Sequence, residues 1–171
     1  MADFNPAFEK TVRRWEAFKL TNHAGDHGRQ TYAGISRRWW PQWPGWFLVD
    51  AKKPVPEEFV ADFYRTQFWE CVEGDAIRHQ DVAEIIFDWA VNAGLPNAVR
   101  MTMDVLGLPP GLGMQAAVRE LRNLHSPRLF VTEYALRRIA HRATVLKRDP
   151  TQVKFIKGWI NRDLSFALEG G

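Results

Sequence analysis

Apolar residues recur at helical spacing through most of the chain. Near the N-terminus, four of them are separated by four, four and three positions: Phe4, Phe8, Val12 and Trp15. This spacing places the four side chains on one face of a helix. Asn5 followed by Pro6 is typical of a helix start, with the asparagine as cap and the proline at the first helical position. We therefore expect a first helix from Asn5 to about Leu20.

The second half of the chain predicts a series of further helices. One follows Pro56 and buries a face formed by Val60, Tyr64, Phe68 and Cys71. The next begins at a capping box of Asp81 and Glu84, and its apolar stripe is formed by Val82, Ile85, Ile86 and Trp89. Four more helices are expected at residues 95–106, 112–124, 126–147 and 151–168. The last should turn four apolar residues inward: Val153, Ile156, Ile160 and Leu164.

Residues 22–50 interrupt the helical pattern. Residues 22–30 contain two glycines and no apolar periodicity, which predicts a loop. Residues 31–35 predict one strand of a small hairpin, and residues 36–50 are expected to be irregular because Pro41, Pro44 and Gly45 break regular structure. The pattern therefore predicts a mainly α fold with one small irregular or β-hairpin insert.

The composition fits one folded domain. The chain has 171 residues, of which 46% are hydrophobic. No apolar run approaches the roughly 18 residues that suggest a membrane span, so no membrane insertion is expected. The N-terminus lacks the apolar core of a Sec signal peptide, which predicts synthesis in the cytoplasm without that signal. Cys71 is the single cysteine, which excludes an internal disulfide, and we interpret it as a core residue.

Charge and tryptophan content narrow the class of partner. The net charge of +3 and the pI of about 9.2 suit an anionic partner: nucleic acid, lipid or cell-wall polymer. No helix-turn-helix or RNA-binding signature is present, so no nucleic-acid partner is expected. Four of the eight tryptophans lie in WWPQWPGW: Trp39, Trp40, Trp43 and Trp46. Indole rings stack on sugars and also fill cores, so this motif predicts a sugar-stacking wall, a local aromatic core, or both. The basic residues at 137–148 are interpreted as a solvated helix surface.

One short segment near the N-terminus holds the candidate chemistry. On the predicted helix, Glu16 lies at the edge of the apolar stripe, where partial burial raises the pKa of a carboxyl. Asp26 lies in polar loop, which favours its ionised form. Carboxyls whose pKa values are pushed apart are the usual acid and base of a glycosidase, and Thr31 is placed to hold a nucleophilic water. Two alternatives stay open: a solvated helix end running into a turn, and a metal site of His23, Asp26 and His27, for which no second ligand cluster exists.

The same residues resemble a known family. W-E-A-F, then D-H-G-R-Q-T-Y-A-G-I-S, then P-Q-W-P-G-W is similar to the N-terminal signature of the glycoside hydrolase 108 family. Its members are phage-type N-acetylmuramidases, also called secretion-activator proteins. FDWAVNAGLPNAV (87–99) and KFIKGWINR (154–162) resemble the peptidoglycan-binding segment that follows in that family. Together these stretches span nearly the whole chain.

The resemblance implies a lysozyme-like, mainly α fold, with residues 1–171 as a single structural unit. Within it, residues 1–75 would be the catalytic segment and residues 76–171 a helical peptidoglycan-binding segment. The implied reaction is hydrolysis of the peptidoglycan glycan strand between N-acetylmuramic acid and N-acetylglucosamine, without a cofactor or metal. The family's catalytic carboxyls correspond to Glu16 and Asp26. Substrate contacts are expected from five further residues: Arg29, Tyr32, Trp43, Trp46 and Asn92.

Three positions depart from the family pattern. Ala17 and Phe18 stand where the family has two glycines after the glutamate, and Arg29 replaces a glycine in the loop. Larger side chains there alter the room beside the acid. The alternative function is therefore a non-catalytic protein that binds the cell wall on the same fold.

The cellular setting follows from the expected substrate. Peptidoglycan is the expected partner, and the protein is expected to be a monomer. Without a Sec signal, it would reach the periplasm or cell wall by holin release or by export through a secretion machine. The second route would pair the protein with an immunity or inhibitor protein.

Overall fold

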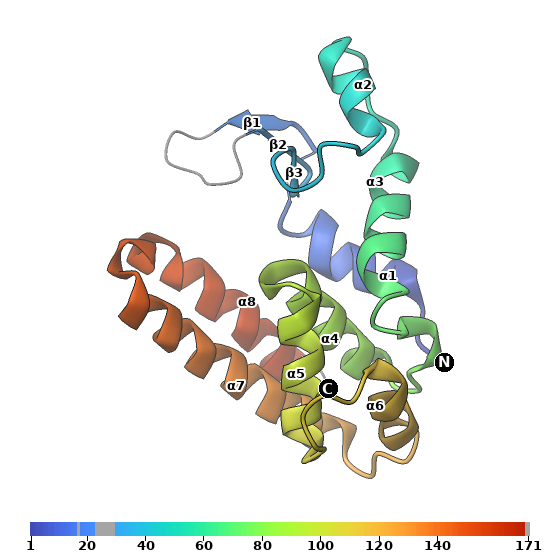
Figure 1. Cartoon of the computed structure of the whole chain (residues 1–171), viewed down its shortest axis with the longest axis vertical. Helices are drawn as coiled ribbons and strands as arrows, with labels where there is room; N and C mark the ends of the chain where they lie inside the picture. The colour runs from blue at the N-terminus through green and yellow to red at the C-terminus, as the bar shows by residue number, and fades with distance from the viewer. Residues whose placement is uncertain (17, 23–29, 170–171) are drawn as a thin grey trace.

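The computed structural model of the protein describes residues 1–16, 18–22 and 30–169. Within these ranges, helices form most of the molecule, and one small antiparallel sheet is the exception (Figure 1). The predicted mainly α, lysozyme-like fold class is therefore confirmed. No helix in this part of the chain is both long and apolar enough to cross a membrane.

The N-terminal helix begins earlier than predicted. α1 (Phe4–Phe8) is capped by Asp3, whose carboxylate accepts a hydrogen bond from the Asn5 amide at 2.8 Å. The predicted cap at Asn5 is therefore wrong, because the aspartate two residues earlier supplies the acceptor that the free amide needs. The helix continues as a π-helical segment, η1 (Glu9–Arg13). The predicted face is confirmed at Phe4, Phe8 and Val12, which are buried.

The first helical segment also ends earlier than predicted. The Glu16 amide still donates to the Val12 carbonyl at 2.8 Å, but Glu16 itself has left helical geometry. Leu20, the predicted helix end, already lies in strand β1 (Leu20–Asn22). A π-helix is a wide turn that proteins use in short pieces, often beside functional sites. Glu16 is thus carried just beyond a helix end.

The predicted hairpin is present as a three-stranded sheet. β1 pairs with β2 (Gln30–Tyr32), and β2 pairs with β3 (Ile35–Ser36). Both pairs are antiparallel, with Thr31 opposite Thr21 in the first. The two turn residues before β3, Ala33 and Gly34, have φ angles of 46° and 78°. Two successive positive φ angles suit the tight turn of a two-residue hairpin.

The proline-rich stretch after the sheet is less irregular than predicted. Residues 45–50 form a short helix, α2 (Gly45–Asp50), and Trp46 fixes it by burying its ring. After Pro56 comes α3 (Glu57–Tyr64), followed by a second π-helical segment, η2 (Arg65–Trp69).

The prediction that Cys71 lies in the core is wrong, because its thiol is exposed. Val60, Tyr64 and Phe68 are buried as predicted, and Val72 continues the face in place of Cys71. The π-helical turn explains the change, since its wider turn moves the buried position one residue along the chain.

The C-terminal helices follow the predicted order. They are η3 (Gly74–Ala76), α4 (Gln80–Ala93), α5 (Leu95–Leu106), α6 (Met114–Leu121), α7 (Pro127–Arg148), η4 (Pro150–Phe155) and α8 (Ile156–Glu169). α5 has the predicted bounds, and Gly107 ends it with a φ of 65°.

Two details of the predicted helices are wrong. Asp81 and Glu84 form no capping box, because the Asp81 carboxylate accepts from the amide of Val82 and the buried Glu84 pairs with Lys10 at 3.3 Å. Val153 does not face inward: its side chain is 60% exposed. It lies in η4, a 3-10 helix whose tighter turn rotates it away from the apolar stripe.

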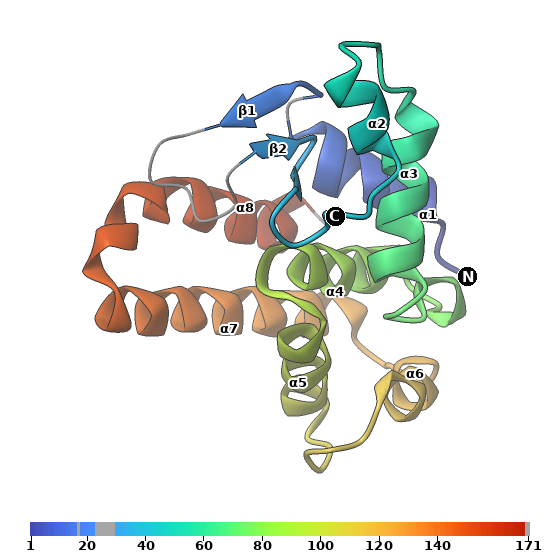
Figure 2. The ribbon, with the colours of Figure 1, turned by 45° about the horizontal axis from the view of Figure 1, so that its top comes forward.

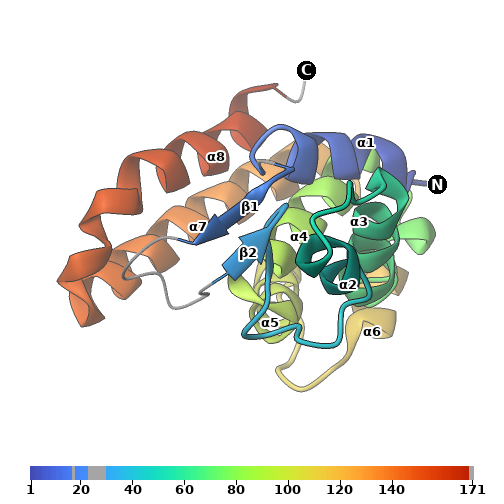
Figure 3. The ribbon, with the colours of Figure 1, turned by 90° about the horizontal axis from the view of Figure 1, so that it is seen from above.

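α4 lies at the centre of the molecule. Every residue from Val82 to Ala90 is buried, so this helix is covered on all sides along that stretch. α1 and α3 lie on one side of α4, while α7 and α8 run side by side as a long antiparallel pair on the other (Figures 2 and 3). Residues from both ends of the chain therefore meet around α4.

Candidate active site

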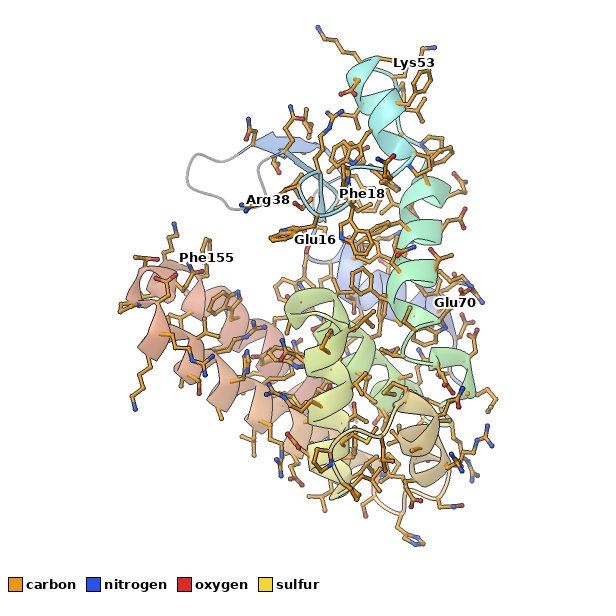
Figure 4. All side chains as sticks on the ribbon, viewed as in Figure 1. Glu16, Phe18, Arg38, Lys53, Glu70 and Phe155 are labelled. Atoms are coloured by element: carbon orange, nitrogen blue, oxygen red, sulfur yellow. The ribbon has the colours of Figure 1, made fainter. Side chains whose placement is uncertain are left out.

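Glu16 lies between two parts of the molecule. Figure 4 shows it below the strands and above the C-terminal helices. Its side chain is 29% exposed, which leaves the carboxyl accessible but poorly solvated. Burial raises the pKa of this carboxyl, while the Arg162 guanidinium lowers it and the Asp88 carboxylate raises it again. The net shift is upward, which confirms the predicted direction.

The hairpin turn packs closely against this carboxyl at Gly34. A Cβ atom built on Gly34 would lie 2.9 Å from Glu16 Cδ, 3.0 Å from its Oε2 and 2.4 Å from the Tyr64 hydroxyl oxygen. A side chain at this position therefore cannot be placed without moving its neighbours. The buried Tyr64 hydroxyl donates to the Ala33 carbonyl at 2.9 Å and holds the turn in place. Burial raises the pKa of Tyr64, so the phenol stays a neutral donor. The TYAGIS motif thus packs its glycine against the candidate acid.

Arg162 forms an ion pair with the Glu16 carboxyl. Its Nη1 lies 3.7 Å from Glu16 Oε1. Its Nε donates to Asp88 Oδ1 at 2.8 Å, and its Nη2 donates to the Thr11 carbonyl at 2.8 Å. The guanidinium carbon lies 5.5 Å from the centre of the Trp15 ring. Burial lowers the pKa of Arg162, but Asp88 and Glu16 outweigh that effect and raise it, so Arg162 remains a cation.

A buried cluster of charges continues from Arg162 into the helical core. Asp88 is fully buried and also accepts from Arg138 Nη2 at 2.6 Å. The same Arg138 nitrogen lies 2.7 Å from Asp163 Oδ1, and Arg142 Nε donates to Asp163 at 3.4 Å. Burial opposes the ionisation of Asp88, but the guanidinium groups of Arg162 and Arg138 outweigh it and hold its pKa below the ordinary value.

The predicted solvated surface at residues 137–148 is therefore wrong for Arg138 and Arg142. These side chains are 0% and 5% exposed, and both stack on Trp89, with guanidinium carbons 5.0 and 4.6 Å from its ring centre. The sequence did carry a signal: the two arginines continue the four-residue spacing of the buried Phe130 and Tyr134. The predicted core position of Trp89 is confirmed.

The structure places three of the sequence-predicted site residues near this cluster or the hairpin. Thr31 and Tyr32 are half-buried in β2, just before the turn that contacts Glu16. Asn92 donates its amide to the Asp88 carbonyl at 2.8 Å and to the Asp88 carboxylate at 3.3 Å. Asn92 thus supports the buried aspartate. Asp26 and Arg29, like Ala17, lie outside the described residues.

Phe18, the remaining departure from the family pattern, is half-buried and packs against the hydrophobic core. Its ring therefore has a structural role in addition to any effect on the space near the acid.

The tryptophan motif divides between core and surface. Trp43 and Trp46 are 6% and 3% exposed, and their indole nitrogens donate to the carbonyls of Phe59 and Trp40. Rings this deeply buried have little surface left for a sugar, although Trp43 is among the residues that line a pocket against α3. The substrate contacts expected from Trp43 and Trp46 remain predictions. Trp39 is 64% exposed and Trp40 is half-buried, so the accessible indole surface belongs to them.

Trp39 and Trp40 line two pockets. One, of about 580 Å³, lies between these tryptophans, the hairpin turn at Gly34 and the end of α4 at Gly94. The other, of about 500 Å³, is lined by the same rings and by residues of α3, and Asp62 and Gln67 are among its polar residues. The first pocket shares Gly34 and Tyr64 with the surroundings of Glu16.

Metal ligation has no support in the part of the chain that the structure describes. No group of three or more histidine, cysteine, aspartate or glutamate residues there could hold a metal ion. The alternative site of His23, Asp26 and His27 lies outside the described residues.

Comparisons with known proteins agree with the resemblance seen in the sequence. The family model of glycosyl hydrolase 108 matches residues 9–94, a segment that contains Glu16, the hairpin, the tryptophan motif and Asp88. The solved structure of SagA from Brucella abortus is similar with a TM-score of 0.68 and 25% identity, over 98% of this chain and 97% of that chain. No curated protein sequence gives a significant match. The chain belongs to the glycosyl hydrolase 108 family.

Proposed function

We propose that this protein is a muramidase that hydrolyses peptidoglycan between N-acetylmuramic acid and N-acetylglucosamine, with Glu16 as the general acid. Family membership supports the coarser statement of a glycoside hydrolase acting on peptidoglycan. The observation that carries the finer proposal is the Glu16 carboxyl itself. It is partly accessible, its pKa is raised by burial, and a glycine turn and an arginine hold it in place.

A raised pKa suits the acid step of glycoside cleavage. The acid must be protonated at working pH so that it can give a proton to the leaving glycosidic oxygen. Burial keeps the proton on Glu16 to a higher pH than on a solvated glutamate, while its 29% exposure leaves the carboxyl within reach of substrate. Asp26 is proposed as the base, or as a charge that stabilises the oxocarbenium-like transition state, with Thr31 holding the water.

The pockets around Trp39 and Trp40 support a saccharide substrate. Sugar rings present C–H faces that stack on indole and hydroxyls that need polar partners. The exposed ring of Trp39 and the polar groups of Asp62 and Gln67 provide both kinds of contact. We propose that the glycan strand runs from Glu16 toward these rings, which add to the aromatic contacts expected from Trp43 and Trp46.

The remaining features of the proposal concern the setting. Residues 76–171 would add peptidoglycan affinity, and a monomer would suffice for activity. Release through a holin or export by a secretion machine would bring the enzyme to the cell wall, in the second case with an immunity or inhibitor protein.

The test compares Glu16→Gln with the wild type on purified peptidoglycan sacculi. Glutamine keeps the shape of the side chain but cannot donate the proton, so the release of reducing ends should fall by about 10²- to 10⁴-fold. Mass spectrometry of the soluble wild-type products identifies the bond, because muramidase cleavage leaves N-acetylmuramic acid at the reducing end. Wild-type activity in the variant would refute the assignment of Glu16.

Glu58→Gln is the matched control, since Glu58 is an exposed glutamate on α3 and should retain full activity. The non-catalytic alternative predicts a different result altogether. The wild-type protein would then sediment with insoluble peptidoglycan and release no soluble fragments, whatever residue occupies position 16.

A further inference from the structure

The ion pair at Glu16 joins opposite ends of the chain. Glu16 and Asp88 lie within the segment that matches the family model, whereas Arg162 lies in α8, well beyond residue 94 where that match ends. Arg162 is 6% exposed and is held by four neighbours: Asp88, the Thr11 carbonyl, the Trp15 ring and Glu16. A side chain with so many fixed contacts presents its guanidinium in one orientation.

We propose that Arg162, held in turn by Asp88, is a positioning residue that anchors the Glu16 carboxyl, and that α8 is thereby part of the catalytic apparatus. This inference rests on the proposed function of Glu16. It would add a role at the active site to the segment of residues 76–171, which is predicted to bind peptidoglycan.

The geometry assigns opposite electrostatic roles to the two partners of Glu16. Arg162 Nη1, at 3.7 Å, stabilises the ionised carboxylate, whereas the buried Asp88 carboxylate disfavours a second negative charge nearby. Tyr64 on α3 also faces this group but stays neutral. Removing the cation and removing the anion should therefore change the pH dependence of activity in opposite directions.

The experiment measures the pH profile of reducing-end release from sacculi at low substrate concentration. Activity falls at high pH as the acid loses its proton, and this fall is the alkaline limb of the profile. In Arg162→Gln the alkaline limb should move to higher pH, because Glu16 loses the positive charge that favours its ionised form. In Asp88→Asn the limb should move to lower pH, because Arg162 is then free to pair with Glu16 alone. Arg162→Lys keeps the charge but loses the planar guanidinium group, so the pH profile should stay in place while the rate at its plateau falls by about 10- to 100-fold.

Arg142→Gln is the matched control. Arg142 is 5% exposed and pairs with Asp163, yet no contact joins it to Glu16 among the described residues. It should lower the melting temperature and leave the alkaline limb in place. Each variant is assayed below its own melting temperature. If Arg162→Gln does not fold, the inference is still tested by the expected shift to lower pH in Asp88→Asn and by the unshifted profile with a lower rate in Arg162→Lys.

Failure of this inference is distinct from failure of the proposed function. If Glu16→Gln is inactive but the limb of Asp88→Asn stays fixed or moves to higher pH, the positioning role is refuted and the acid assignment stands. If Glu16→Gln keeps wild-type activity, the assignment of Glu16 as the acid is refuted, and this inference falls with it.

Discussion

At the scale of single residues, the Glu16 carboxyl can lie against the hairpin turn because Gly34 has no Cβ atom. The φ of 78° at this position disfavours any other residue, and the nearest carboxyl and hydroxyl atoms occupy the place where a Cβ would stand. The glycine of TYAGIS therefore serves both the turn and the carboxyl. The sequence could predict that a hairpin turn lies here, but not that the turn packs against Glu16.

We expect Gly34→Ala to damage both stability and activity. The positive φ costs an alanine about 1–2 kcal/mol, and relief of the clash must shift Glu16 or Tyr64. A displacement of about 1 Å at the acid lowers activity on the order of 10²-fold. Thermal unfolding and reducing-end release measure the two effects. An alanine variant with wild-type activity would show that the contact does not position the acid.

Glu16 illustrates what could be predicted at this scale. The structure agrees with the predicted partial burial and upward pKa shift, although the helix ends before Glu16 and distant residues complete its surroundings. Arg162 could not be predicted, since nothing in local spacing shows which distant helix supplies a partner. The role of Asp26 remains a prediction.

At the scale of elements, the accuracy of the prediction follows the regularity of each helix. α5 and α7 were predicted closely, because uninterrupted 3.6-residue periodicity and a glycine or proline boundary define them. The first helix and the helix after Pro56 were misjudged where they become π-helical, because a wider turn breaks that periodicity. The predicted exposure of Arg138 and Arg142 on α7 is wrong because carboxylates from other helices pair with them in the core.

α8 offers a direct test of a helical position. Gly158 lies in this helix, and an added Cβ there meets no atom within 4 Å. Gly158→Ala should raise the stability by about 0.5–1 kcal/mol, because alanine loses less backbone entropy on folding. The corresponding rise in melting temperature is about 1–4 °C. A lower melting temperature would contradict the assigned helix geometry.

At the scale of the whole molecule, the fold is held around α4 by groups from both chain ends. Thr11 and Glu16 contact Arg162, and Asp88 joins Arg162 to Arg138. The division of the chain at residue 75 into a catalytic segment and a peptidoglycan-binding segment remains a prediction. Folding, by contrast, cannot be divided there, since α4 packs against elements on both sides of that point.

The raised pKa of Glu16 predicts a pH-dependent stability. In the unfolded chain the carboxyl ionises near its ordinary value of 4.5, whereas in the folded protein it ionises at higher pH. Its contribution is therefore complete below about pH 4.5 and is lost as pH rises through the folded pKa. Glu16→Gln does not titrate, so its melting temperature relative to the wild type should increase across this window. Scans at pH 4 and pH 8 measure the difference, with Glu58→Gln as the control; a smaller difference at pH 8 would contradict the raised pKa.

The buried cluster of charges has a consequence for how related sequences diverge. Asp88, Arg138 and Asp163 are each fully buried, so replacing one of them leaves another with a buried charge that has lost its partner. Breaking such a pair costs about 3–5 kcal/mol, against a total stability of about 5–15 kcal/mol for a typical domain. A lineage can seldom lose one of these residues and keep the others. We therefore expect the cluster to be inherited or replaced as a block, and its members to covary when homologous chains are aligned.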